Sequence, residues 1–465
     1  MTGKNTIRLS DHFTFGRLLR YAFPSIVMLV FTSIYGVVDG FFVSNFVGKT
    51  PFAAVNFIMP FLMLLGCVGF LFGTGGGALI AVTLGAGHRQ KANQLFSMLV
   101  YVSIACGVVL AVLGLIFVRP IARLLGAEGQ LLEDSVRYAL FILPAIPAYV
   151  LQYEFQCLFA TAEKPKLGLC VTVAAGLTNM VLDALFVAVL GWGLEGAAAA
   201  TALSQCVGGT LPLIYFARPN ASLLRLGRAG LDLRALGKVC SNGSSELMSN
   251  VSMSLVSMLY NIQLLRYAGE DGVAAYGVLM YLNMIFLAAF LGYSVGTAPV
   301  VSFHYGAGHS GELRGLLIRS LWAVALFAVV MFSAAELLAR PLSMIFVSYD
   351  PQLLAITLRG FAIYSFSFLF AGFSIYSSAF FTALNNGLVS ALISFYGPWS
   401  FRWRRCWCFP CSGSWTASGF PSWRRRLFRP WCRPCCCGRC GGGIITAEIR
   451  PEPEGSRGRF SSPVF

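Results

Sequence analysis

Long apolar stretches separated by short polar connections run through most of the chain. Stretches of about 20 or more residues begin near positions 21, 52, 95, 137, 167, 195, 243, 273, 316 and 356. Each is long enough to cross a lipid bilayer as an α-helix, whereas the strands of a membrane β-barrel would be short and would alternate in polarity. The pattern therefore predicts an all-α polytopic membrane protein with about ten transmembrane helices.

The connections between these stretches alternate in charge. Basic connections at 89–91, 164–166, 218–238 and 314 fall on the same side as a basic amino terminus. Because basic loops remain in the cytoplasm, we expect a multi-pass protein of the cell inner (plasma) membrane with a cytoplasmic N-terminus and membrane lipids as its surroundings. The composition agrees, with 57% hydrophobic and 11% charged residues.

The chain repeats itself at a fixed spacing. The sequence LGAGH at Leu84–His88 returns as YGAGH at Tyr305–His309, an offset of 221 residues, and the same offset pairs Gly75 with Gly296. An offset that spans six helices places both copies in the same orientation. We therefore predict two six-helix lobes related by a parallel pseudo-two-fold repeat: an N-lobe at 1–217, a cytoplasmic linker at 218–242 and a truncated C-lobe at 243–396. This is the architecture of rocking secondary transporters.

Polar side chains inside the apolar stretches are the candidates for chemistry. Asn179 and Asp183 are four residues apart on one helical face, Thr201 lies on the next helix, and Asp39 lies in the first stretch. A carboxylate at membrane depth costs about 2.5 to 3.5 kcal/mol on insertion scales, so it requires a partner, an ion or a proton. Position alone also allows Asp183 to lie at the aqueous end of its helix.

Further candidates lie beside these residues or in the fourth stretch. Tyr35, Gln152 and Glu154 are candidate cavity residues, although Glu154 could equally reach toward the aqueous interface. The offset of 221 maps Asp39 onto Tyr260, so this acid has no counterpart in the second lobe. Glu246 is interpreted as an ordinary first-turn charge at a helix N-terminus.

The sequence offers little for enzymatic chemistry. His88 and His309 lie in repeated turns beside glycine, with too few neighbouring ligands for a metal site. No nucleophile and base show a recognisable spacing. We therefore expect no enzymatic activity, no cofactor, and no metal other than Na⁺ at the acidic residues.

Several motifs together resemble the multidrug and toxic compound extrusion (MATE) family, in its bacterial branch. The resemblance rests on FPSIVMLVFTSIYGVVDGFFVSNFVG, the LGAGH turn, TNMVLDALFVAVLGWGLEGAAAATALSQ, and GSSELMSN followed by YAGEDGVAAYGVL. It implies a twelve-helix antiporter that exports cationic, amphipathic organic compounds in exchange for H⁺ or Na⁺. It also implies a first-lobe cation site, whose residues fall on Asp39, Asn179, Asp183 and Thr201. We expect the protein to act as a monomer.

Either coupling ion suits these residue types. A proton or a sodium ion would compensate the buried carboxylate charge, and Asn179 and Thr201 would add the neutral oxygen ligands that a hard cation prefers. Binding would change the packing of the first helix and bias the lobes between inward and outward openings.

The sequence departs from the family after position 396. From Pro398 onward the chain holds 12 Arg and 3 Glu, together with 8 of the 14 Cys, so the excess positive charge does not indicate a nucleic-acid partner. If Trp403–Cys408 is encoded by TGG CGG CGG TGC TGG TGC after a G, a shift of one base reads Val-Ala-Ala-Val-Leu-Val. We therefore interpret 397–465 as a frameshifted, disordered tail that replaces helices eleven and twelve, a loss that would leave this chain inactive.

Two other functions remain open from the residues. A lipid or lipid-linked oligosaccharide flippase of related two-lobe design would require a strongly basic cavity, whereas this chain places carboxylates in its first lobe. A non-transporting membrane protein would show no ion-dependent efflux.

Overall fold

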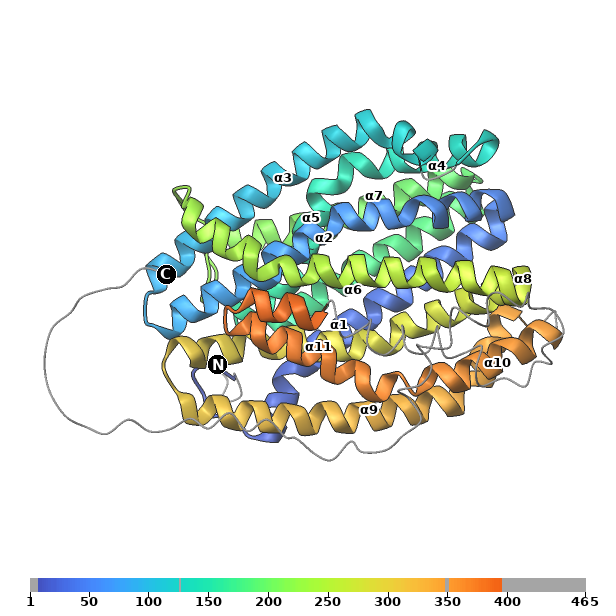
Figure 1. Ribbon diagram of the computed structural model, residues 1–465. Helices are drawn as coiled ribbons and strands as arrows, with labels where there is room; N and C mark the ends of the chain where they lie inside the picture. Colours follow the sequence, from blue (N-terminus) through green and yellow to red (C-terminus); the bar gives the residue numbers. More distant parts are fainter. Residues whose placement is uncertain (1–6, 125–126, 348–350, 395–465) are drawn as a thin grey trace, which may run out of the picture. The chain divides into compact units, whose positions relative to one another are not determined.

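The computed structural model describes residues 7–124, 127–347 and 351–394, so the tail predicted at 397–465 lies outside the described residues. Regular structure in the described part is entirely helical (Figure 1). The elements are α1 (Phe15–Phe42), η1 (Val43–Val47), α2 (Lys49–Gly85), α3 (Arg89–Leu124), α4 (Gly129–Ile142), η2 (Leu143–Ala145), α5 (Ile146–Thr161), α6 (Pro165–Asp183), η3 (Ala184–Val189), α7 (Gly193–Ala217), α8 (Leu233–Gly306), α9 (Ser310–Val347), α10 (Pro351–Ser365) and α11 (Phe368–Ala383). A further helix begins at 387 and is described as far as 394.

Eight of the described helices are long and apolar enough to cross a membrane, which confirms a multi-pass membrane protein. They match eight of the ten apolar stretches in the sequence. The stretch near 243 falls on the first part of α8, and the stretch near 356 is divided between α10 and α11. The candidate spans are Phe15–Val47, Ala54–Gly85, Arg89–Leu124, Gly129–Thr161, Pro165–Val189, Gly193–Ala217, Asn283–Gly306 and Ser310–Pro341.

The long helix α8 reverses its direction. Gly75 of α2 approaches Val239 and Gly243, and Gly85 of α2 approaches Phe303. The two glycines are about 15 Å apart along α2, whereas Gly243 and Phe303 would be about 90 Å apart on a straight helix. The chain therefore folds back between Gly243 and Phe303 (Figure 1). The two arms correspond to the predicted seventh and eighth stretches.

The repeat seen in the sequence is also a repeat of the fold. α2 ends at Gly85 and α8 at Gly306, and the next helices begin at Arg89 and Ser310. Both lobes break their fourth stretch in the same register, at η2 in the first lobe and between α10 and α11 in the second. The two-lobe repeat is thereby confirmed, while the predicted boundaries of the lobes and of the linker stay predictions.

Close helix packing joins the two lobes. A Cβ at Gly85 would overlap the carbonyl oxygen of Phe303, and a Cβ at Gly306 would overlap the carbonyl oxygen of Val82. The offset of 221 residues relates Gly85 to Gly306 and Val82 to Phe303, so the two contacts are equivalent. The lobes therefore meet through equivalent surfaces. Glycine is required at both positions because the backbones of α2 and α8 touch there.

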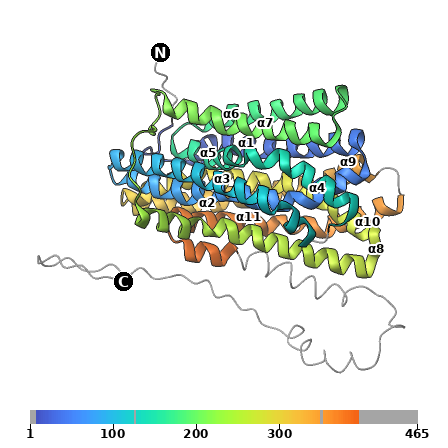
Figure 2. The ribbon, with the colours of Figure 1, turned by 90° about the horizontal axis from the view of Figure 1, so that it is seen from above.

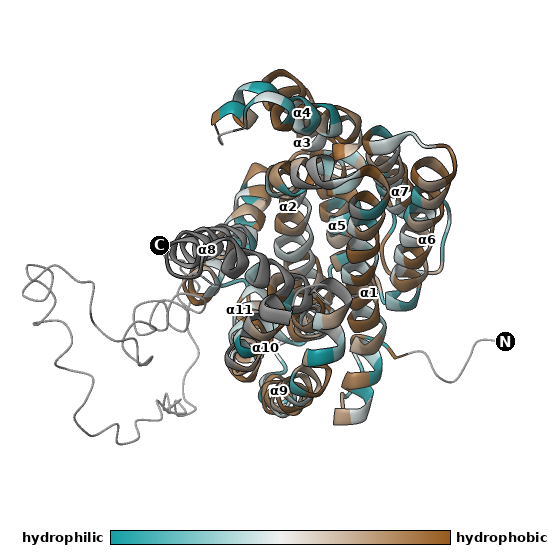
Figure 3. Cartoon of the chain, turned by 90° about the vertical axis from the view of Figure 1, so that its right-hand side faces the viewer, coloured by the Kyte–Doolittle hydropathy of each residue, from teal (hydrophilic) through white to brown (hydrophobic). Residues whose placement is uncertain are grey.

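The outward faces of several helices are apolar. α3 exposes Val109 and Ile116, and α9 exposes Trp322 and Leu337, each by more than half of its surface. The brown helices at the rim of the bundle in Figure 3 show the same pattern, and Figure 2 gives the view from above. Exposed apolar faces of this kind suit contact with lipid.

Candidate functional site

The site begins where α1 and α6 approach each other. A Cβ at Gly176 would overlap the rings of Phe31 and Tyr35, so only glycine permits this approach. Gly176 lies one turn before Asn179 and two turns before Asp183 on the same helix. The close approach therefore brings Asp39, one turn beyond Tyr35, toward the polar face of α6.

The two predicted acids meet at this crossing. The carboxyl groups of Asp39 and Asp183 lie beside each other, and the hydroxyl of Thr201 from α7 lies beside Asp39. Asp39 is 6% exposed, Asp183 0% and Asn179 1%, whereas Thr201 is half-buried. The first helix α1 and the distant pair α6 and α7 thus contribute to one buried polar group, here called the acid-pair site: Asp39, Asn179, Asp183 and Thr201.

Both acids stand next to irregular helical turns. Asp39 lies one turn before the π-helical segment η1, and Asp183 is the last residue of α6 before the π-helical segment η3. The two π-helical segments contact each other. Such segments are rare and are frequent at functional sites. The next helix, α7, starts at Gly193, and the positive φ angles of Gly191 and Gly193 form the turn between η3 and α7.

Several polar atoms of the acid-pair site are incompletely satisfied. Within the described residues, a fully formed hydrogen bond is lacking at both carboxylate oxygens of Asp183, at both side-chain amide atoms of Asn179 and at the hydroxyl of Thr201. A buried polar atom without a partner is costly, in particular a carboxylate oxygen. The donor set of two carboxylates, one amide and one hydroxyl fits a hard monovalent cation, and the carboxylates equally fit a proton.

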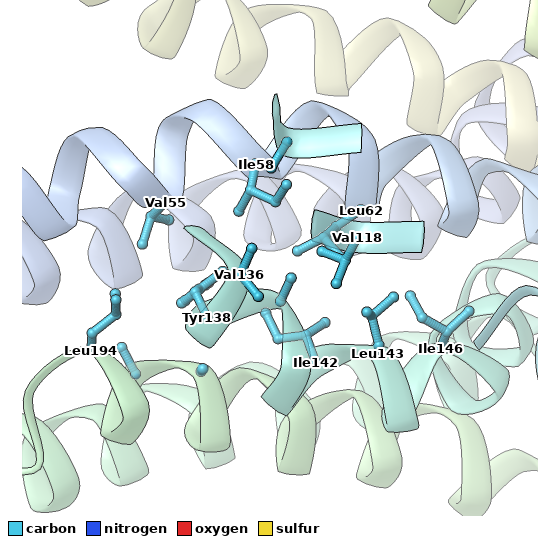
Figure 4. Packing of buried hydrophobic residues seen from close by; sticks show 14 of the residues in the cluster. Val55, Ile58, Leu62, Val118, Val136, Tyr138, Ile142, Leu143, Ile146 and Leu194 are labelled. Carbon is cyan, nitrogen blue, oxygen red and sulfur yellow. The ribbon is translucent and has the colours of Figure 1, made fainter. Parts of the chain in front are cut away.

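One residue of the site was missed by sequence reasoning. Tyr138 of α4 is fully buried, and its hydroxyl lies beside Thr201 and near the carboxyl groups of Asp39 and Asp183. Its ring packs among apolar side chains that include Ile142 and Leu194 (Figure 4). A tyrosine in an apolar stretch carries no distinctive pattern, so only the packing of α4 against α7 could identify it.

The remaining candidates divide into two groups. Tyr35 and Gln152 interact with each other, and Tyr35 lies near Asp39, so both belong beside the acid-pair site. Glu154 is fully buried but faces α3, where Ser103 is its neighbour. It does not reach an aqueous interface, and it lies apart from the acid pair.

A separate small cavity of about 50 Å³ lies between the two lobes. Its lining includes Thr74 and Thr161 from the first lobe and Glu246, Ser294 and Thr382 from the second. Glu246 is thirteen residues inside α8, so the interpretation as a first-turn charge is wrong. The helix begins earlier than expected because Asp232 caps it by accepting from the backbone N–H groups of residues 234 and 235.

The two repeated histidines occupy equivalent turns. His88 follows Gly87 and His309 follows Gly308, and both glycines have positive φ angles. The described residues hold no cluster of three or more His, Cys, Asp or Glu side chains suited to a metal ion. The turn interpretation of both histidines agrees with this geometry.

The sequence comparison identifies the family. The MatE family profile matches residues 24–185 and 247–399, which together form most of the chain and carry both lobes. The chain belongs to the MatE family. Three of the four residues of the acid-pair site, Asp39, Asn179 and Asp183, lie within the matched part, and Thr201 lies outside it.

Relatives of this MatE chain include multidrug export proteins. It is 24% identical over 366 residues to the multidrug export protein MepA of Staphylococcus haemolyticus, covering 77% of this chain and 80% of the relative. It is 22% identical over 367 residues to MepA of Staphylococcus aureus strain NCTC 8325, with the same coverage.

Solved structures show the same fold. An outward-facing multidrug resistance MATE family transporter of the MOP superfamily superposes with a TM-score of 0.83 at 20% identity, covering 89% of this chain and 92% of that chain. A MOP superfamily transporter from Pyrococcus furiosus superposes with a TM-score of 0.81 at 20% identity, with the same coverage. The MatE fold therefore extends through nearly all of the described residues.

Proposed function

We propose that this MatE protein is a secondary active antiporter that exports cationic, amphipathic organic compounds in exchange for H⁺ or Na⁺. The observation that carries the proposal is the close approach of two buried carboxyl groups, Asp39 and Asp183, in the first lobe. Two unit negative charges about 4 Å apart repel by about 4 kcal/mol at an effective dielectric constant of 20. A positive ion relieves this repulsion, and the ion can be a proton or sodium.

The first helix, α1, can couple ion binding to the relative position of the two lobes. On one side α1 presents Asp39 to α6, and on the other it packs against α8, where a Cβ at Gly292 would overlap the backbone of Ile26. Binding or release of the ion changes the repulsion within the acid pair and thus the preferred position of α1. Because α1 contacts both lobes, a shift of α1 biases their relative packing.

The cavity between the lobes supports a cationic substrate. Glu246 contributes a carboxylate to its lining, and the described lining residues include no Lys or Arg. A flippase for anionic lipid headgroups would favour a basic lining. The acidic cavity agrees with the export of drugs that the names of the MepA relatives state for those proteins.

Efflux measurements in proteoliposomes test the proposal. A fluorescent organic cation is loaded, pH and sodium gradients are imposed separately, and the chain is compared with a version whose reading frame is restored after 396. We expect Asp39→Asn and Asp183→Asn each to abolish ion-coupled efflux in whichever of the two versions transports, while both variant proteins still insert normally into the membrane. Asp134→Asn is the matched control, because Asp134 is also a buried first-lobe acid but is paired with Gln130. Ion-coupled efflux that persists in both acid-pair variants refutes the site.

A further inference from the structure

The segment 7–14 before α1, here called the strap, lies across the ends of both lobes. The Leu9 backbone N–H donates to Oε1 of Glu163 at 2.6 Å, and Glu163 lies in the turn between α5 and α6 of the first lobe. Four residues later the Phe13 backbone N–H donates to Oε1 of Glu312 at 3.1 Å. Glu312 belongs to the first turn of α9 in the second lobe.

The second-lobe end of the strap is held by several contacts. His12 Nδ1 lies 2.7 Å from Glu312 Oε2, and Arg319 Nη1 donates to the Phe13 carbonyl oxygen at 2.6 Å and to Glu312 at 3.2 Å. A carboxylate that accepts from a backbone amide and from cationic groups forms stronger hydrogen bonds than a neutral acceptor. Glu312 therefore fixes both the backbone and a side chain of the strap.

The side chains of the strap are also buried. Leu9 and Phe13 are both 0% exposed and belong to an apolar cluster with Val300, Val301 and Leu316 of the second lobe. The Phe13 ring lies edge-on to His304 at a centroid distance of 6.3 Å. The segment that leads into the first helix of the N-lobe is thus packed on the C-lobe.

The strap lies at the same end of the bundle as a backbone contact between the two lobes. Phe303, which packs against the apolar cluster of the strap, is the residue whose carbonyl oxygen meets Gly85 of α2. This crossing of α2 and α8 brings the two lobes into backbone contact. The strap, attached at Glu163 in the first lobe and at Glu312 in the second, therefore crosses the interface between the lobes near the contact of Gly85 with Phe303.

Geometry limits how far the lobes can part while the strap is attached. Leu9 and Phe13 are four residues apart, and four residues of extended chain reach at most about 14 Å. Opening this face wider would require release from Glu163 or from Glu312. The offset of 221 maps Glu163 onto Leu384 and Glu312 onto Lys91, so neither attachment has an acidic counterpart in the repeat.

We propose that the strap is a latch that holds the two lobes together on the predicted cytoplasmic face, with Glu163 and Glu312 as its two attachment points. Release of the strap accompanies opening of that face. The inference rests on the proposed alternating access of the two lobes, and it adds two positioning residues that lie outside the acid-pair site and the cavity.

Hydrogen–deuterium exchange of the full chain in lipid nanodiscs tests the latch without any transport measurement. Glu163→Asn removes the acceptor, because its shorter side chain ends one methylene further from Leu9. Asparagine also tolerates the positive φ of 58° at this position. Glu312→Ala removes the other acceptor within a helix. Glu163→Gln is the matched control, because it retains an acceptor oxygen at the same reach.

We expect the amides of Leu9 and Phe13 to be protected in the unmodified chain and to exchange about tenfold faster or more in the Asn and Ala variants. Amides of 80–86 and 300–306, on both sides of the crossing, should also exchange faster in those variants, whereas Glu163→Gln should resemble the unmodified chain. Exposed strap amides in the unmodified chain, or faster strap exchange with no change at the crossing, would overturn the latch. If the protein shows no ion-coupled efflux, the proposed function of the acid-pair site fails, but the exchange measurement of the latch can still be interpreted.

Discussion

The hydroxyl of Tyr138 offers a test of the acid-pair site that leaves its charges intact. The substitution Tyr138→Phe removes the hydroxyl that lies beside Thr201 and near the two carboxyl groups, and it keeps the ring in its apolar cluster. The hydroxyl oxygen has no fully formed hydrogen bond within the described residues, so its removal leaves no buried partner unsatisfied. Because a buried hydroxyl without a formed hydrogen bond is itself costly, its removal should leave the folding stability unchanged or raise it.

The effect on ion coupling should be larger than the effect on stability. If the Tyr138 hydroxyl supports the occupied site, its loss removes one hydrogen bond, worth about 0.5 to 1.5 kcal/mol. Since 1.4 kcal/mol corresponds to a factor of about ten, the ion concentration for half-maximal efflux should rise about two- to tenfold. The maximal rate should fall less, because both carboxylates remain.

The assay compares this concentration and the thermal midpoint of unfolding in the same preparation. Tyr376→Phe is the matched control, because Tyr376 is 2% exposed, also has a hydroxyl without a formed hydrogen bond, and lies in the second lobe. It should leave the half-maximal ion concentration unchanged. The assignment is wrong if both tyrosine variants shift it equally, or if Tyr138→Phe leaves it unchanged while Asp39→Asn abolishes coupling.

Two further predictions concern packing and the strap. Gly176→Ala should destabilise the protein by about 1 to 3 kcal/mol and impair ion coupling, because the new Cβ overlaps Phe31 and Tyr35. The midpoint of thermal unfolding measures the loss of stability. Gly16→Ala is the control, because Gly16 has open space around it. Burial raises the pKa of Glu163 above its ordinary value of 4.5, and the Leu9 amide and Arg8 only partly oppose this. The folded state therefore holds this proton more tightly than the unfolded state, and the contribution of Glu163 to stability is present below pH 4.5 and declines as the pH rises through the raised pKa. Glu163→Gln should flatten this decline in a series of unfolding midpoints across that window, and an unaltered pH dependence contradicts it.

Much of the fold follows from the linear pattern of residues. A run of apolar residues longer than a bilayer is thick can satisfy its backbone only as a helix, so the spans are visible without tertiary information. The offset of 221 also predicted the parallel repeat, because insertion into a membrane preserves orientation in copies separated by an even number of helices. The break at η2 and its counterpart between α10 and α11 were not expected, because a short irregular turn scarcely alters the hydropathy of a span.

The candidate residues were predictable to different degrees. Asp39 and Asp183 stand out because a charge in an apolar span demands an explanation, whereas Tyr138 does not. Glu246 was misinterpreted because the start of α8 depends on a cap at Asp232, well before the apolar stretch begins. Glu154 looks equivalent to the other acids in sequence, and only the rotation of α5 directs it toward α3.

The sequence by itself determined that this chain crosses a membrane many times, that it is built from two copies of one unit, and that its unusual acids lie in the first copy. Only the tertiary structure decided which polar groups meet: the acid pair with Tyr138, the cavity with Glu246, and the strap between Glu163 and Glu312. The physical reason is that hydropathy and insertion act on each helix separately. The meeting of side chains depends on the rotation and close approach of helices, which positions such as Gly176 and Gly85 permit.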